Sequence, residues 1–72
     1  MLFEKTAIVT GAASGIGYAV AQALRQEGAQ VVMADVNEAL LIESARELGG
    51  VPFVGNLTRR EDCRRLVEFT VE

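Results

Sequence analysis

The stretch TGAASGIG, residues 10–17, contains three glycines and no charged side chain, and it directly follows the apolar run Ala7-Ile8-Val9. An apolar run that ends in a glycine-rich turn is typical of a strand buried on both faces of a parallel sheet. A turn without bulky side chains also lets a large anion approach main-chain N–H groups. We therefore predict a strand over residues 5–10 and an anion-binding turn after it.

A helix is predicted after this turn, over residues 16–27. Four apolar residues fall at helical spacing, and we expect them to form its buried face: Ile16, Val20, Ala23 and Leu24. Gly28 follows at the place where a residue with a left-handed backbone conformation commonly ends a helix.

A second strand and a second helix come next in the sequence. The run Val31-Val32-Met33-Ala34 predicts a buried strand that ends at Asp35. Asn37 belongs to the residue types that favour the N-cap position, and the helix it begins is expected to reach Leu48. Gly49-Gly50 then ends this helix.

The remainder of the chain predicts a third strand over residues 51–55 and a third helix. Pro52 lies near the start of the strand, where its missing N–H is tolerated. Thr58 and Glu61 fit the T-x-x-E capping box at the start of the helix. We expect one face of this helix to pack against the sheet, and its residues are Cys63, Leu66, Val67, Thr70 and Val71. Cys63 is therefore expected to be buried.

The basic residues of the third helix are expected on a solvated face. Four of the seven basic residues of the chain lie here: Arg59, Arg60, Arg64 and Arg65. Acidic neighbours accompany them, and the i to i+4 spacing predicts an ion pair between Glu61 and Arg65.

Composition and charge narrow the class of protein. Of the 72 residues, 50% are apolar and 24% are charged, which indicates a globular unit rather than a disordered chain. A formal net charge of −3 argues against a nucleic-acid partner. No apolar run approaches the roughly 18 residues of a membrane span, and we find no secretion signal. Because Cys63 is the only cysteine, we expect a cytoplasmic protein.

The glycine turn and Asp35 together suggest a nucleotide cofactor. A helix that starts directly after a glycine turn attracts a pyrophosphate through its free N–H groups and its dipole. Asp35 lies 20 residues beyond Gly15, at a strand end where a carboxylate can bind the ribose hydroxyls of an adenosine. No Arg or Lys occurs at residues 12–14 or 36–37 to neutralise a 2′-phosphate. The pattern therefore favours NAD over NADP.

Simpler interpretations of these residues exist. The glycines alone could serve an ordinary strand-to-helix turn, and Asp35 alone could be a solvated carboxylate at a strand end. A methyltransferase that uses S-adenosylmethionine also needs a glycine-rich first turn and an acidic residue after the second strand. The spacing of Gly11, Gly15 and Gly17, with Thr10 before them, argues against a methyltransferase.

The sequence resembles the short-chain dehydrogenases/reductases. Their glycine motif T-G-x-x-x-G-x-G is matched by Thr10, Gly11, Gly15 and Gly17, and the resemblance extends over KTAIVTGAASGIG, VVMADVN and VPFVGNLT. It implies an α/β fold, namely the N-terminal βαβαβα part of a Rossmann-type doubly wound parallel sheet, with the first strand next to the second. It also implies an NAD-dependent oxidoreductase acting on an alcohol/carbonyl pair.

The resemblance also implies which residues hold the cofactor. Residues after the third strand contact the adenine ring in this family, and Asn56 and Leu57 stand there, with Asn56 in place of the usual Asp. An amide can still donate and accept hydrogen bonds at an adenine edge. The complete predicted cofactor site is Gly11, Ser14, Gly15, Ile16, Gly17, Asp35, Val36, Asn56 and Leu57. No metal site is predicted.

No catalytic residue is predicted within these 72 residues. The family uses a Tyr-x-x-x-Lys pair with a Ser and an Asn, but Tyr18 is the only tyrosine, Lys5 is the only lysine, and Gln22 stands four residues after Tyr18. We expect residues 1–72 to be a single partial NAD-binding domain of a longer dehydrogenase, whose missing C-terminal part would bind the small-molecule substrate. The alternative is a nucleotide-binding module without chemistry of its own.

An open first strand would accompany such a partial sheet. The fourth strand of the family pairs beside the first, so its absence would leave an apolar sheet edge. We therefore expect self-association through this edge, or a homo-oligomer of the full-length protein.

The 72-residue chain, purified alone, should not oxidise alcohols with NAD, because it lacks the proton-transfer groups of the family. The measurement is NADH formation with a panel of primary and secondary alcohols. Turnover above the uncatalysed rate would contradict this prediction.

Overall fold

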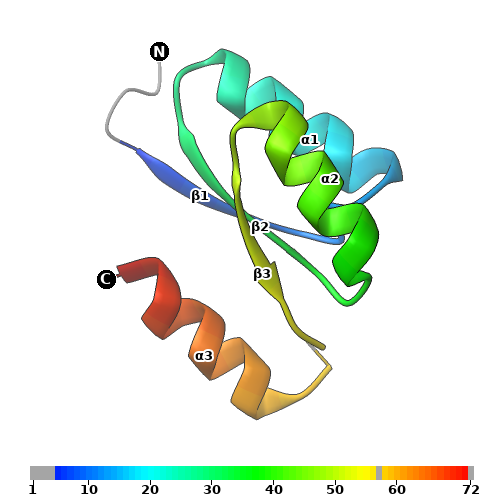
Figure 1. Cartoon of the computed structure of the whole chain (residues 1–72). Helices are drawn as coiled ribbons and strands as arrows, with labels where there is room; N and C mark the ends of the chain where they lie inside the picture. Colours follow the sequence, from blue (N-terminus) through cyan, green and yellow to red (C-terminus); the bar gives the residue numbers. More distant parts are fainter. Residues whose placement is uncertain (1–4, 57, 72) are drawn as a thin grey trace.

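The computed structural model describes residues 5–56 and 58–71 (Figure 1). Strands and helices alternate along the chain, which confirms the predicted α/β class. The elements are β1 (Thr6–Thr10), α1 (Gly15–Gln26), β2 (Gln30–Asp35), α2 (Glu38–Leu48), β3 (Val51–Val54) and α3 (Arg60–Val71). The predicted bounds differ from these by one residue at the starts of β1 and β2, at both ends of α1 and at the end of β3.

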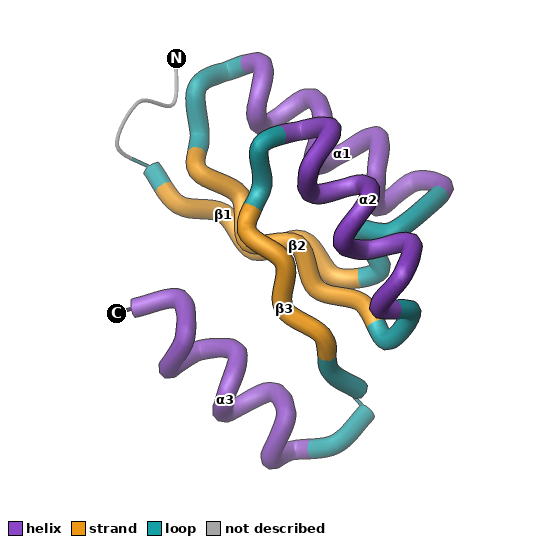
Figure 2. Tube along the Cα trace, in the orientation of Figure 1, coloured by secondary structure: helices purple, strands orange, loops and turns teal. Residues whose placement is uncertain are grey.

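The three strands form one parallel sheet with the order β1-β2-β3. The register pairs Ala7 with Val31 and Ala34 with Phe53, so β2 is the central strand. Figure 2 shows α1 and α2 on one side of the sheet and α3 on the other. The two crossover helices thus cover one face and α3, which follows β3, covers the other, so helices lie on both faces as in a Rossmann-type sheet.

The central strand β2 supplies the core on both faces of the sheet. Val31 and Met33 belong to the cluster under α1 and α2, whereas Val32 and Ala34 belong to the cluster under α3. All four are at most 5% exposed. Successive residues of a strand point to opposite faces of the sheet, and here both faces are buried. The sequence of β2 is therefore apolar at consecutive positions.

The buried face of α1 is not the one predicted. Ile16, Val20 and Ala23 are exposed, and of the four predicted residues only Leu24 packs against the core. Ala21 is fully buried instead. Because its side chain is small, Ala21 lets the helix approach the sheet closely.

Three of the predicted helix ends are confirmed. Gly28 and Gly49 adopt left-handed backbone angles, with φ of 96° and 72°, at the ends of α1 and α2. The Asn37 side chain accepts a hydrogen bond of 3.2 Å from the Leu40 N–H at the start of α2.

The predicted capping box of α3 is wrong. The helix begins at Arg60, and the Thr58 hydroxyl donates a hydrogen bond of 2.6 Å to the Asn56 side-chain oxygen rather than capping the helix. Asn56 competes successfully because its side chain forms a local turn with the Thr58 N–H, at 3.0 Å.

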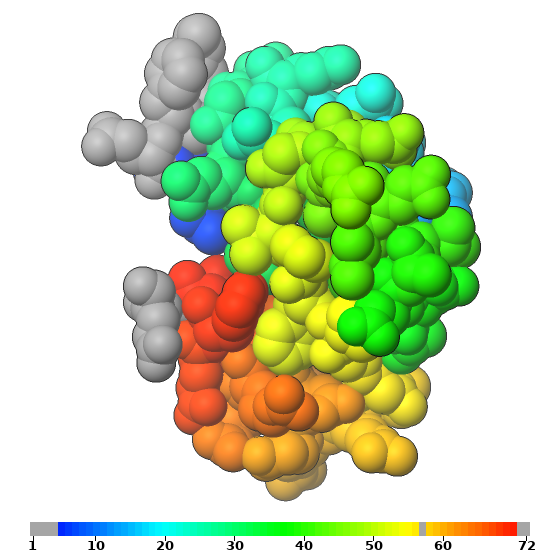
Figure 3. All heavy atoms as spheres, in the orientation of Figure 1, coloured from blue at the N-terminus to red at the C-terminus, as the bar shows by residue number. Residues whose placement is uncertain are grey.

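Helix α3 packs on β3 through fewer residues than predicted. Leu66 is buried and the Phe69 ring lies 5.4 Å from the Phe53 ring, centroid to centroid. The space-filling view shows the spheres of α3 and β3 in direct contact (Figure 3). Cys63 and Val67 are exposed, contrary to the prediction, because they flank the narrow row that faces the sheet. The side chain of Val71 lies outside the described residues.

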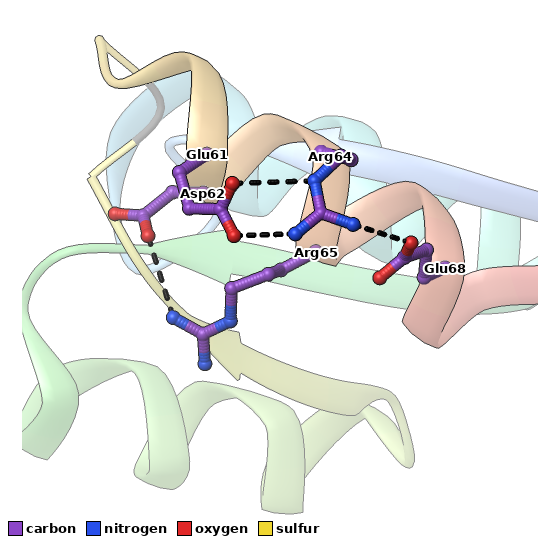
Figure 4. Close-up of polar contacts among 5 residues, drawn as sticks. All are labelled: Glu61, Asp62, Arg64, Arg65 and Glu68. Carbon is purple, nitrogen blue, oxygen red and sulfur yellow. Dashed lines mark hydrogen bonds and ion pairs between the residues drawn. The ribbon is translucent and has the colours of Figure 1, made fainter.

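The solvated face of α3 carries a ladder of exposed ion pairs (Figure 4). Arg64 pairs with both Glu61 and Glu68, and Arg65 pairs with Asp62 at 3.4 Å. The expected pair of Glu61 with Arg65 is therefore wrong, because Arg64 takes Glu61 at the i to i+3 spacing. Exposed pairs of this kind contribute little to stability.

Strand β1 pairs on one side only within the described part of the chain. Ile8, in its middle, is 42% exposed. An unpaired strand edge with apolar side chains is a template for association with a second copy.

We predict that the 72-residue chain self-associates and that Ile8→Lys reduces this association, because a charged side chain blunts an open edge. Sedimentation velocity over a concentration series measures the effect. Ile42→Lys is the matched control, since Ile42 is 41% exposed but lies on α2. A wild-type chain that stays monomeric, or equal effects of the two substitutions, would contradict the role of the edge.

Candidate functional site

An open cleft lies at the carboxyl ends of the three strands. Its volume is about 460 Å³, and its lining comes from the ends of β1, β2 and β3 and the residues that follow them: Thr10, Gly11, Ala34, Asp35, Val36, Gly55, Asn56 and Thr58. In parallel α/β sheets, ligands bind outside this edge because the loops after the strands converge there.

The glycine turn at one end of the cleft depends on two different properties of glycine. Gly11 and Gly15 have φ of 62° and 64°, a conformation that other residues adopt only with strain. Gly17 is required for a steric reason: a Cβ atom there would lie 2.0 Å from the Gly11 carbonyl oxygen. Helix α1 can therefore begin directly against the turn.

The first turn of α1 has unused hydrogen-bond donors. Its N-cap residue, Ser14, makes no side-chain capping bond, and the first turn contains no acidic residue. Among the described residues, no acceptor is found for the N–H groups of Gly15, Ile16 and Gly17. Ile16 is 83% exposed. These donors and the positive end of the helix dipole favour an anion at this place.

Asp35, at the end of β2, forms a hydrogen bond with the glycine turn. One carboxylate oxygen accepts from the Ala13 N–H and the other from the Asn37 N–H, both at 3.0 Å. The bond from the Asn37 N–H is the main cause that lowers the pKa of this carboxyl; burial opposes it, and the N–H groups of Ala13 and Val36 lower the pKa further. The group is therefore ionised at neutral pH, and each oxygen keeps a lone pair for a further donor.

Ser44 also holds the glycine turn, from α2. Its hydroxyl donates a hydrogen bond of 3.0 Å to the Ala13 carbonyl, and its side chain is 6% exposed. Sequence reasoning missed this residue. The available signal was its position between Leu41 and Ala45 on the buried face of α2, where a polar side chain needs a partner.

The segment after β3 is held by its own hydrogen bonds. The Gly55 N–H donates to the Asp35 carbonyl at 3.1 Å, and the Asn56 N–H donates to the Asp62 carboxylate at 2.9 Å. The Asn56 side-chain oxygen accepts from both the N–H and the hydroxyl of Thr58. The side-chain NH2 group of Asn56 makes no hydrogen bond to the described residues and can donate to a ligand.

The predicted cofactor residues converge on this cleft. Gly11, Asp35, Val36 and Asn56 line it, and residues 14–17 form the adjoining start of α1. Leu57 lies outside the described residues.

Tyr18 is not among the residues that line the cleft. The Tyr18 hydroxyl donates to Glu47 on α2 at 3.4 Å. Within residues 5–56 and 58–71, no group of three or more metal-binding side chains is found. The helices in those ranges are also too short or too polar to cross a membrane.

Comparison with known proteins decides the family. The model of the short chain dehydrogenase family matches residues 5–72. This chain belongs to that family. It is 38% identical over 73 residues to the diacetyl reductase [(S)-acetoin forming] of Staphylococcus epidermidis, and 44% identical over 68 residues to the L-fucose dehydrogenase of Bos taurus. These matches cover 94% and 93% of this short-chain dehydrogenase sequence, but only 28% and 25% of the two relatives.

A solved structure has the same fold over the matched part of its chain. The 3-ketoacyl-(acyl-carrier-protein) reductase from Brucella melitensis, complexed with NADH, superimposes with a TM-score of 0.93 at 29% sequence identity. The match covers 99% of this chain and 30% of the reductase chain. The described βαβαβα unit therefore corresponds to part of a larger enzyme in that structure.

Replacing Gly17 by Ala should destabilise the fold by about 3 kcal/mol, the upper end of overpacking costs, because the new Cβ meets the backbone of Gly11. Gly15→Ala is the matched control: its Cβ would lie in open space, so only a backbone strain of about 1–2 kcal/mol is expected. Urea unfolding measures both. A Gly17→Ala cost no larger than that of Gly15→Ala would refute the steric argument.

Proposed function

We propose that this chain is the NAD-binding part of an oxidoreductase that transfers a hydride between a nicotinamide and an alcohol or carbonyl. The observation that carries the proposal is the ionised carboxylate of Asp35, held in the cleft beside a glycine turn with free N–H groups. The names of the relatives, a diacetyl reductase and an L-fucose dehydrogenase, support carbonyl and alcohol substrates. The NADH complex of the solved relative supports the cofactor.

The order of the strands suggests how a dinucleotide would lie. Neighbouring strands are about 4.8 Å apart, so the glycine turn, Asp35 and Asn56 follow one another across the sheet edge in the order β1, β2, β3. A pyrophosphate at the start of α1, a ribose at Asp35 and a base toward Asn56 match the order of groups in an adenosine diphosphate. Val36 would flank the base, whereas Leu57, which the family resemblance also assigns to the adenine, lies outside the described residues.

The residues of the cleft fit this cofactor chemically. Unpaired N–H groups suit a doubly charged pyrophosphate, and an ionised carboxylate suits two ribose hydroxyls. When bound, NAD would supply the nicotinamide that accepts or releases the hydride. The described residues would bind and orient it, and Tyr18 and Lys5 lack the family spacing for proton transfer. We place the proton-transfer groups and the substrate site in other parts of the protein, and treat residues 1–72 as part of one NAD-binding domain.

Electrostatics at Asp35 underlies the choice of NAD over NADP. A 2′-phosphate about 4 Å from this carboxylate would be repelled by about 4 kcal/mol at an effective dielectric near 20, and water would reduce that value. A residual of about 1.4 kcal/mol still corresponds to a tenfold preference.

Asp35→Ser should therefore shift the ratio of the NAD and NADP dissociation constants toward NADP by about tenfold or more. Because the substitution also removes two backbone hydrogen bonds of the turn, both affinities should fall, and the ratio is the informative quantity. Val36→Arg is the companion variant: it keeps those bonds, adds a cation at the cleft, and should shift the ratio in the same direction. Isothermal titration of the full-length protein measures both. Unchanged ratios in the two variants would exclude Asp35 as the ribose ligand.

A further inference from the structure

Asn56 lines the cleft after β3, and most of its hydrogen-bonding groups are already paired within the chain. Its backbone N–H donates to the Asp62 carboxylate, and its carbonyl accepts from the Arg59 N–H, both at 2.9 Å. Its side-chain oxygen accepts from the N–H and the hydroxyl of Thr58, at 3.0 and 2.6 Å. The side-chain NH2 group, which has no partner among the described residues, is therefore the group that Asn56 offers to a ligand.

The bonds from Thr58 determine which way the Asn56 amide points. A backbone N–H can only donate, so the Asn56 atom that it meets at 3.0 Å must be the oxygen and not the nitrogen. Turning the amide over would place the NH2 group against this N–H, so the bond would be lost and two donors would face each other. The two bonds from Thr58 also use both lone pairs of the oxygen. Asn56 can thus donate to a ligand but cannot accept from it.

A side chain that only donates restricts which atoms of adenine it can contact. The 6-amino group is the hydrogen-bond donor of adenine, whereas the ring nitrogens are acceptors. An ionised carboxylate at the same position would have the opposite requirement, because it only accepts. The exchange of Asp for Asn at this position therefore changes which atom of the base can be bound.

We infer that the side-chain NH2 group of Asn56 donates to a ring nitrogen of adenine, and that Asn56 does not bind the 6-amino group. This inference rests on the proposed NAD binding, because it takes adenine as the base in the cleft. It also narrows the expectation from the sequence that the amide could both donate and accept at the adenine edge.

The first test replaces the donor by an acceptor, in the variant Asn56→Asp. The carboxylate can still accept from Thr58, so the local turn is kept, but an oxygen now faces the lone pair of the ring nitrogen. The full-length protein is titrated with adenosine and with purine riboside, which lacks the 6-amino group. Both ligands are uncharged, so the added charge acts on them only weakly.

We expect Asn56→Asp to weaken both nucleosides equally, by about tenfold, the effect of losing about 1.4 kcal/mol. Gln22→Glu is the matched control: it makes the same change from amide to carboxylate on the exposed surface of α1, outside the cleft lining, and should change neither constant. Tighter binding of adenosine by Asn56→Asp, or unequal changes of the two constants, would mean that this position binds the 6-amino group. Unchanged constants would mean that Asn56 does not contact the base. Each of these results overturns the inference.

The second test changes the ligand and leaves the protein intact. The analogues 1-deaza-, 3-deaza- and 7-deazaadenosine each replace one ring nitrogen by a C–H group. At least one of them should bind wild type about tenfold more weakly than adenosine, and this difference should disappear in Asn56→Asp. Equal binding of all the analogues and adenosine by wild type would overturn the inference, whatever the stability of the variant.

A failure of the proposed function gives a different result. Wild type would then bind neither ADP-ribose nor any of the nucleosides, and the inference would fall with the cofactor. A wild type that binds ADP-ribose but no nucleoside, or that gives any of the contrary results above, would overturn the role of Asn56 alone.

Discussion

The hydrogen bond between the Asp35 carboxylate and the Ala13 N–H connects the two parts of the structure that matter most. Asp35 ends the strand that is buried on both faces, and Ala13 lies in the turn that precedes α1. Helices pack on both faces of β2, so the end of this strand is held in place. The hydrogen bond from Ala13 to Asp35 restricts the turn in the same way. A glycine-rich turn without such an anchor would lose far more conformational entropy on binding a ligand.

The same carboxylate thus stabilises the turn and faces the cleft. In the NAD site that we propose, a group with both roles would couple cofactor preference to local structure: its charge would favour a ribose diol over a phosphate, while its oxygens accept two backbone donors. Changing the preference by removing the charge therefore disturbs the turn as well. Adding a cation at Val36 leaves the anchor intact, because Val36 is 63% exposed and can carry a longer side chain.

Short-range signals in the sequence predicted most of the fold. The runs of β2 and the glycines at 28 and 49 depend on local backbone and burial preferences, and the structure has them as predicted. The errors occurred where tertiary packing selects among equivalent local patterns. Periodicity could not tell whether α1 turns Val20 or Ala21 to the sheet, and Thr58 matched a capping box although its hydroxyl donates to Asn56 and caps no helix.

The candidate site was predictable to the extent that its residues act through type and spacing. Gly11 and Asp35 have few substitutes at their positions, so the motif reveals them, and both line the cleft. Ser44 is different, because serine is common on helices and its importance comes only from the carbonyl it meets 31 residues away. A residue whose role depends on a partner distant in the sequence leaves no local pattern. Its role becomes visible only when the hydrogen bonds of the turn are accounted for one by one, since each buried carbonyl must have a donor.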